Sequence, residues 1–190
     1  MRSPRWRSPC TSPPRRSRSS STTSPSSPAA PGSGCSVRAV LSTGSNMGDA
    51  RGFLGGVVKR MLPVRASSLY ISEPWGGVEQ PPFLNQALLI DAPLLTPHSL
   101  LAACQELERE ANRVRDVRWG PRTLDVDIVD IEGYTSNDPV LTVPHPRAHL
   151  REFVLRPWLE IDPDAVLDGV PVRTWLERLE PQGVRRLEER

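Results

Sequence analysis

Residues 123–131, with the sequence TLDVDIVDI, alternate between apolar and polar side chains. This period of two is typical of a half-buried β-strand, because successive side chains of a strand point to opposite faces. Such a strand would present Asp125 and Asp127 on one face and bury Leu124, Val126 and Ile128 behind the other. The chain is therefore expected to contain a sheet that carries two neighbouring carboxylates on one of its faces.

Similar patterns predict three further strands and two helices before residue 123. The strands are expected at residues 37–44, 64–72 and 83–91, and the first helix at residues 49–61. The second helix begins at Thr96, a good capping residue that precedes Pro97, and extends to about residue 112. Its buried stripe has the spacing of three and four residues that marks a helix, at Leu100, Cys104, Leu107 and Ala111.

The resulting order, β–α–β–β–α–β, predicts an α+β fold with the ferredoxin-like arrangement. Both helices would cover one face of the sheet and leave the other face open for a ligand and for long active-site loops. Residues 141–161 add a short strand, a turn bracketed by prolines and a helix, and residues 174–179 could form a last one. Helical additions are therefore expected at the C-terminus.

Residues 1–36 have a different composition from the rest, with six arginines, seven prolines and no acidic residue. A segment so rich in Ser, Pro and Arg buries too little apolar surface to fold, so a disordered tail is expected before one domain at residues 37–190. An inert extension or a misplaced start codon is the main interpretation, and a targeting signal or a basic interaction arm are the alternatives. Without the tail, 18 basic residues stand against 22 acidic ones, which gives the domain a net charge of −4.

Hydropathy and cysteine content exclude two classes of protein. No apolar run approaches the roughly 18 residues that a membrane helix needs, so no membrane association is expected. The three cysteines, Cys10, Cys35 and Cys104, are widely separated, which argues against a disulfide framework or a zinc site. A cytoplasmic location is the default for such a chain.

Arginines crowd the segment before the acidic strand, at Arg113, Arg115, Arg118 and Arg122. A guanidinium group can donate two parallel hydrogen bonds to phosphate oxygens. Two neighbouring carboxylates can bind Mg²⁺ together with the phosphates of a substrate. The two halves together predict a metal and phosphate site suited to phosphoryl transfer. Either half alone is as readily explained by solvent-exposed charge, and the chain has no G-x-x-x-x-G-K-[ST] phosphate loop.

Several segments in order resemble one enzyme family. RWGPRTLDVDIV at residues 118–129 resembles the signature of the 6-hydroxymethyl-7,8-dihydropterin pyrophosphokinases, and GSNMGD, YISEPWGGVEQPPFLNQALLI, LTVPHPR and REFVLRPWLEI resemble other parts of that family. The resemblance extends over residues 37–161. It implies an enzyme of folate biosynthesis that transfers pyrophosphate from ATP to the hydroxymethyl group of the pterin and releases AMP.

The resemblance also implies roles for residues on the ATP side. Asp125 and Asp127 would hold two Mg²⁺ ions that bridge the ATP phosphates. Arg113 and Arg122 would hold the phosphates and assist transfer. Further nucleotide contacts would come from Gln105, Glu108, Arg115, Trp119, His145 and Arg151, although the chain departs from the family pattern at Val140 and Pro146.

On the pterin side, the resemblance implies a sandwich. Phe83 and Phe153 would stack on the two faces of the ring, and Asn85 would hydrogen-bond its edge. This arrangement suits a flat polar heterocycle, because stacking covers the faces while an amide reads the edge. The pocket would be completed by Gly44, Ser72, Glu73 and Trp75.

Two other functions stay open from the residues alone. A ferredoxin-like sheet could be a nucleic-acid-binding module, but the acidic domain and an aromatic content of only 5% argue against it. The same metal and phosphate chemistry would also serve another Mg²⁺-dependent phosphoryl or nucleotidyl transferase. The expected partners are therefore the small molecules ATP and pterin, with no nucleic acid, and the expected state is a monomer.

Overall fold

The computed structural model describes residues 37–74, 79–111 and 122–188, all of which belong to one compact unit. Its main sheet has the strand order β10-β3-β4-β1-β5, and a short strand, β2, also pairs with β4. The strands are β1 (Val37–Ser45), β2 (Arg65–Ala66), β3 (Tyr70–Ser72), β4 (Phe83–Ala92), β5 (Asp125–Ile131) and β10 (Arg185–Arg186). Each of their pairings is antiparallel.

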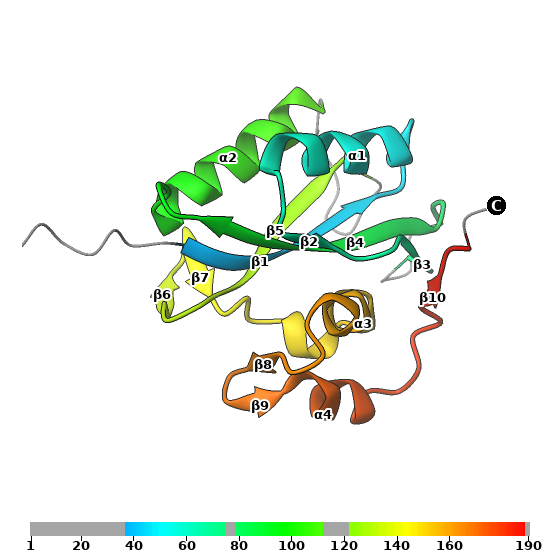
Figure 1. Cartoon of the computed structure of the whole chain (residues 1–190). Helices are drawn as coiled ribbons and strands as arrows, with labels where there is room; N and C mark the ends of the chain where they lie inside the picture. The colour runs from blue at the N-terminus through cyan, green and yellow to red at the C-terminus, as the bar shows by residue number, and fades with distance from the viewer. Residues whose placement is uncertain (1–36, 75–78, 112–121, 189–190) are drawn as a thin grey trace, which may run out of the picture. The chain divides into compact units, whose positions relative to one another are not determined.

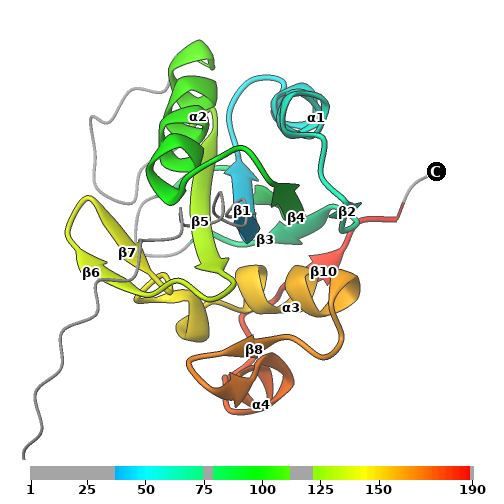
Figure 2. The same cartoon turned by 60° about the vertical axis from the view of Figure 1, so that its left-hand side comes forward.

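Two helices lie on one face of the main sheet, and the C-terminal elements lie on the other (Figure 1). The first two helices are α1 (Ala50–Met61) and α2 (Pro97–Glu110). The C-terminal elements are the 3₁₀ helix η1 (Ala148–Leu150), α3 (Glu152–Ile161), α4 (Val172–Glu177) and the hairpin of β8 (Val166–Leu167) and β9 (Val170–Pro171). A second hairpin, β6 (Ser136–Asp138) with β7 (Leu141–Val143), lies beside β5 (Figure 2).

Local chemistry explains where the helices begin. The Asp49 side chain accepts a hydrogen bond of 3.0 Å from the Gly52 amide and so caps α1. At α2, the Thr96 hydroxyl accepts from the Ser99 amide, and the Ser99 hydroxyl accepts from the Thr96 amide. Each bond satisfies a backbone N–H group that the first turn of a helix leaves without a partner.

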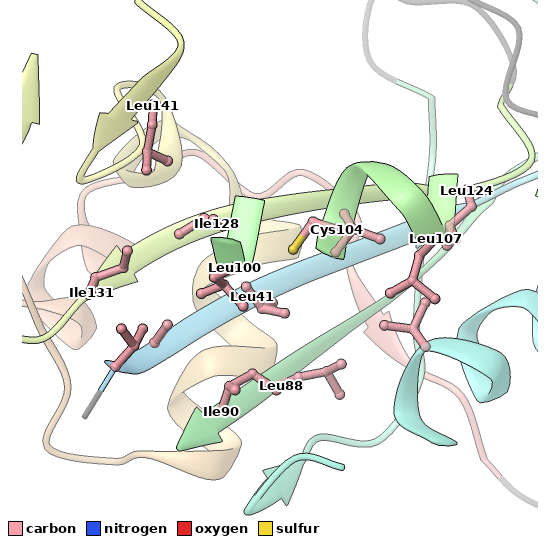
Figure 3. Packing of buried hydrophobic residues seen from close by; sticks show 14 of the residues in the cluster. Leu41, Leu88, Ile90, Leu100, Cys104, Leu107, Leu124, Ile128, Ile131 and Leu141 are labelled. Carbon is pink, nitrogen blue, oxygen red and sulfur yellow. The ribbon is translucent and has the colours of Figure 1, made fainter. Parts of the chain in front are cut away.

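The sheet separates two hydrophobic cores. The first lies under α1 and α2 and contains Leu41, Leu88, Leu100, Cys104 and Leu124, each at most 2% exposed (Figure 3). The second lies under α3 and α4 and contains Val40, Leu89, Val129, Leu155 and Trp158. Because both faces bury apolar side chains, alternate residues of the central strands serve different cores.

The prediction that the second sheet face stays open is wrong. Helix α3 packs on that face, where Val154, Leu155 and Trp158 contact the second core. The helix itself was expected from the sequence, but the face that it covers depends on long-range packing. Among the described residues, one end of the second face stays uncovered and is lined as a pocket.

The prediction of a single strand at residues 64–72 is also wrong, because the structure divides this segment into β2 and β3. Ser67 lies between them, and its hydroxyl accepts the amide hydrogen of Ala87 at 3.0 Å while it donates to the Ser68 carbonyl. The Ser67 amide still donates to the Ala87 carbonyl at 2.9 Å, but the Ser67 hydroxyl accepts the return bond in place of a backbone carbonyl, so the strand is interrupted there. Within the described part of the chain, no helix is both long enough and apolar enough to cross a membrane.

Candidate active site

The candidate site lies where the second sheet face changes from apolar to polar. Below α3, this face presents apolar residues from the three central strands, Val40, Ala87, Leu89 and Val129. Two residues further along each strand, toward the uncovered end, the same face presents Ser42 on β1, Asn85 on β4 and Asp127 on β5. The alternation of each strand thus continues from the core into a polar pocket.

The start of α3 forms the remaining wall of this pocket. Arg151 precedes the helix and Phe153 lies in its first turn, and both side chains line the pocket. Its full lining is Ser42, Gly44, Ser72, Glu73, Phe83, Asn85, Arg122, Asp125, Asp127, Arg151 and Phe153. Ten of these eleven residues were predicted from the sequence, and they come from five separate segments.

Each of the two aspartates of the pocket is paired with its own arginine. Arg122 Nη1 donates to Asp125 Oδ2, and Arg151 Nη1 donates to Asp127 Oδ2 at 3.3 Å. Each arginine also faces an aromatic ring. The Arg122 Cζ atom lies 5.9 Å from the Phe83 ring centre, and the Arg151 Cζ atom lies 5.6 Å from that of Phe153. The guanidinium groups therefore lie between an acidic half of the pocket, formed by Asp125 and Asp127, and an aromatic half, formed by Phe83 and Phe153.

Asp125 and Asp127 are the residues of this pocket that could hold a divalent cation. They supply the hard oxygen ligands that Mg²⁺ prefers, and Mg²⁺ is commonly bound by one or two carboxylates plus substrate phosphates. Within residues 37–74, 79–111 and 122–188, no group of three or more His, Cys, Asp or Glu is arranged for a metal ion. A cation here would therefore need ligands beyond the described side chains, and substrate phosphates and water are ligands that Mg²⁺ commonly takes.

Hydrogen bonds fix the orientation of the buried Asn85 amide, which is 3% exposed. Its Nδ2 atom donates to the Ser72 hydroxyl at 2.9 Å. Its Oδ1 atom lies on the side of Gly44, where an added Cβ would come within 3.5 Å of it. The amide therefore presents an acceptor to the pocket, and the missing side chain at Gly44 keeps space beside it.

Asn46 organises the segments around the pocket, although sequence reasoning did not single it out. Its Oδ1 atom accepts the Arg122 amide hydrogen at 2.9 Å. Its Nδ2 atom donates to the Gln80 side chain at 3.0 Å and to the Pro81 carbonyl at 2.9 Å. Asn46 thus ties the backbone of Arg122 to the segment that leads into β4.

His145 lies near the pocket but does not line it. Burial, followed by the nearby positive charge of Arg151, lowers its pKa to about 4. Its Nδ1 atom accepts the Arg147 amide hydrogen at 3.2 Å, so the neutral ring carries its proton on Nε2. At neutral pH, His145 can donate one hydrogen bond but supplies no positive charge.

The two helical residues predicted to contact nucleotide lie outside the pocket. Gln105 is exposed on α2, and Glu108 is buried beside the edge of β5. The Glu108 Oε1 atom accepts the amide hydrogen of Val126 at 3.0 Å, and Val126 lies between the two aspartates. Glu108 thereby supports the strand that carries the carboxylates.

Four predicted site residues lie outside the described part of the chain. They are Trp75, Arg113, Arg115 and Trp119. Conversely, Ser42 lines the pocket without having been predicted. The signal was present in the sequence, because Ser42 lies two residues before Gly44 on a predicted strand and so shares its face.

The sequence is similar to those of known proteins. Residues 40–163 match the family model of 7,8-dihydro-6-hydroxymethylpterin-pyrophosphokinase. The chain is 45% identical over 159 residues to the 2-amino-4-hydroxy-6-hydroxymethyldihydropteridine pyrophosphokinase of Mycobacterium tuberculosis, which covers 76% of this chain and 85% of the relative. It is 43% identical over 157 residues to the protein of the same description from Methylorubrum extorquens, with 80% of this chain and 99% of the relative covered.

Solved structures show a similar fold. A crystal structure of Plasmodium falciparum HPPK-DHPS with pterin and p-hydrobenzoate has a TM-score of 0.61 at 13% identity, over 77% of this chain and 45% of the other. The wild-type protein with SDX-DHP has a TM-score of 0.60 at 12% identity, over 75% and 44%. This chain spans less than half the length of those chains, and at such identities the likeness concerns the fold alone.

Proposed function

Since the chain belongs to the 7,8-dihydro-6-hydroxymethylpterin-pyrophosphokinase family, we propose that the pocket between α3 and the sheet is its active site. The chain transfers pyrophosphate from ATP to the hydroxymethyl group of hydroxymethyldihydropterin, a step of folate biosynthesis. In this reaction a bond forms between the hydroxymethyl oxygen and the β-phosphorus. The bond from that phosphorus to the oxygen of the α-phosphate breaks, AMP leaves, and the proton of the hydroxyl group is released.

The aromatic half of the pocket is proposed to bind the pterin. Phe83 and Phe153 come from different elements and line the same pocket, so a flat ring can be placed between them. The Asn85 Oδ1 atom would accept a hydrogen bond from an N–H group at the ring edge. Its orientation is fixed in advance by Ser72, which reduces the entropy lost on binding.

The acidic half of the pocket is proposed to bind the phosphates. Arg122 and Arg151 would donate to phosphate oxygens, and their pairing with Asp125 and Asp127 holds them at the pocket before substrate arrives. The carboxylates fit Mg²⁺, with two ions expected, and bound Mg²⁺ would neutralise the charge that gathers on the phosphates. Arg113, Arg115, Trp119, Gln105, Glu108 and His145 are proposed to complete the nucleotide side.

Other features of the protein are also proposals. The order β3-β4-β1-β5 with α1 and α2 on one face supports a ferredoxin-like arrangement. We expect residues 37–190 to act as one pyrophosphokinase domain, with Trp75 beside the pterin and residues 1–36 as a dispensable tail. A cytoplasmic monomer whose partners are ATP and pterin is the simplest state for this domain.

One observation carries the proposed site: each arginine of the pocket contacts one carboxylate and lies over one aromatic ring. This arrangement brings a phosphate-binding set next to a ring-binding set, as transfer between ATP and a heterocyclic alcohol requires. The test is to incubate the protein with ATP, Mg²⁺ and hydroxymethyldihydropterin and to identify the nucleotide that is released. AMP in equal amount to the pterin diphosphate is expected, whereas ADP would refute the assignment.

A further inference from the structure

Gln182 makes three hydrogen bonds with the segment at the start of α3. Its side-chain Oε1 atom accepts the backbone amide hydrogen of Glu152 at 3.0 Å. Its backbone N–H group donates to Glu152 Oε2 at 2.6 Å. Its Nε2 atom donates to the Leu150 carbonyl at 2.9 Å. Residue 182 lies beyond residues 40–163, which match the family model.

These contacts replace a missing cap. The first N–H groups of a helix have no partner within the helix. Arg151, at the capping position of α3, makes no side-chain capping bond. The Gln182 side chain supplies a capping bond from 30 residues away. The backbone N–H group of Gln182 satisfies one oxygen of the Glu152 carboxylate, a residue that is only 3% exposed. The other oxygen accepts from Arg156 Nε at 2.9 Å.

The capped residue lies between two side chains of the pocket. Arg151 and Phe153 flank Glu152 directly, and both line the pocket. Since the Glu152 backbone and side chain are both held by Gln182, the rotation of the helix start is fixed at this point. The directions in which Arg151 and Phe153 project depend on that rotation.

The same C-terminal segment is attached to the opposite wall. Val184 is 8% exposed, and β10 pairs with β3 through Arg185 and Arg186 (Figures 1 and 2). The Leu187 amide donates to the Leu69 carbonyl at 2.8 Å. Because β3 carries Ser72 on the other side of the pocket, residues 182–187 connect the wall that holds Asn85 to the wall that holds Phe153.

We propose that Gln182 is a positioning residue for pterin binding. It does not line the pocket, and it acts by holding the start of α3 so that Phe153 and Arg151 face the sheet. This inference rests on the proposed function, because it requires Phe153 to contact the pterin. It predicts that the C-terminal segment determines substrate affinity as well as stability.

The test is a double-mutant cycle of Gln182→Ala and Phe153→Ala in the full-length protein. Calorimetry would measure the dissociation constant of hydroxymethyldihydropterin with Mg²⁺ and a non-transferable ATP analogue present. Each single variant should weaken binding by about three- to tenfold, the range for loss of one aromatic contact. In the Phe153→Ala background, Gln182→Ala should have little further effect, because residues that act through each other are not additive.

Controls separate positioning from general destabilisation. Glu180→Ala changes an exposed side chain of the same segment and should leave binding unchanged. Gln182→Met keeps the length of the side chain without its two side-chain hydrogen bonds and should behave like Gln182→Ala, since both variants keep the backbone bond to Glu152. Amide exchange at Glu152 should be faster in both Gln182 variants and unchanged in Glu180→Ala, at temperatures where all the variants remain folded.

The outcomes distinguish a failure of the assigned pterin pocket from a failure of the positioning role of Gln182. If Phe153→Ala binds pterin normally, the assignment of the pocket fails and the role of Gln182 fails with it. If Phe153→Ala weakens binding but the effect of Gln182→Ala is absent or simply additive, the positioning role is refuted and the assigned pocket stands. Non-additive weakening with faster exchange at Glu152 supports the inference.

Discussion

Asp127→Asn is the replacement that most directly tests the acidic half of the pocket. It removes one charge, keeps the size and shape of the side chain, and leaves Arg151 without the carboxylate that lies 3.3 Å away. If Asp127 binds the phosphates of ATP through a cation, catalysis should suffer far more than folding. If it is only one half of a surface ion pair, both effects should be small.

The cost to stability can be estimated from the geometry. At 3.3 Å, two unit charges attract with about 5 kcal/mol at an effective dielectric of 20 and about 1.3 kcal/mol in bulk water. The Asp127 side chain is 37% exposed, so solvent screening reduces the net value to about 1 kcal/mol or less. Relief of repulsion with Asp125 offsets part of this loss. The melting temperature should therefore fall by no more than roughly 4 °C.

The cost to catalysis should be larger. Removing one preorganised electrostatic contact from a reacting centre typically costs about 2.7–4 kcal/mol, or roughly a hundred- to a thousandfold in kcat. The assay is release of AMP at saturating pterin, with melting temperatures measured in the same buffer. Magnesium-dependent binding of a non-transferable ATP analogue, followed by calorimetry, should weaken in parallel.

Asp130→Asn is the matched control on the same strand. Asp130 is half-buried outside the pocket, and burial raises the pKa of its carboxyl group, so its charged form is disfavoured in the folded protein. The neutral asparagine should therefore leave activity unchanged and leave stability unchanged or slightly higher. The reasoning is refuted if Asp127→Asn retains more than roughly a tenth of wild-type kcat/KM, a loss below about 1.4 kcal/mol.

Three further predictions concern other parts of the protein. Gly44→Val should reduce kcat/KM for the pterin by roughly a hundredfold, because its side chain would enter the pocket beside Asn85, and the KM for ATP should stay unchanged in steady-state kinetics. The pKa of His145 is about 4 in the folded protein, against an ordinary value of 6.5. Its contribution to stability should therefore be constant above pH 6.5 and be lost as the pH falls from 6.5 to about 4. Melting curves between pH 4 and 7 should show a weaker pH dependence for His145→Gln than for wild type. Removal of residues 1–36 should leave kcat and both KM values within about twofold, and a larger loss would make the tail part of the enzyme.

The acidic strand was predictable because its signal is local. The alternation at residues 123–131 places Asp125 and Asp127 on one face, and both line the pocket as expected. The capping signal at Thr96 likewise placed the start of α2 correctly. In each case, neighbouring residues along the chain determine the geometry.

Features that depend on distant contacts were not predictable in the same way. The sequence of α3 indicates a helix, but nothing in it specifies which sheet face the helix covers. The break at Ser67 depends on the amide of Ala87, 20 residues further along the chain. The role of Asn46 depends on three segments that meet only after folding. Ser42 could have been predicted from the sequence, because it shares a strand face with Gly44.

The contact between Glu108 and Val126 also bears on self-association. Strand β5 ends the main sheet on its side, and the open edge of a sheet can pair with a strand from another molecule. The buried Glu108 carboxylate already accepts the Val126 amide hydrogen, so a foreign strand would find that donor engaged and α2 beside it. An acidic side chain at this edge would thus discourage fibril growth along the strand that carries the two aspartates.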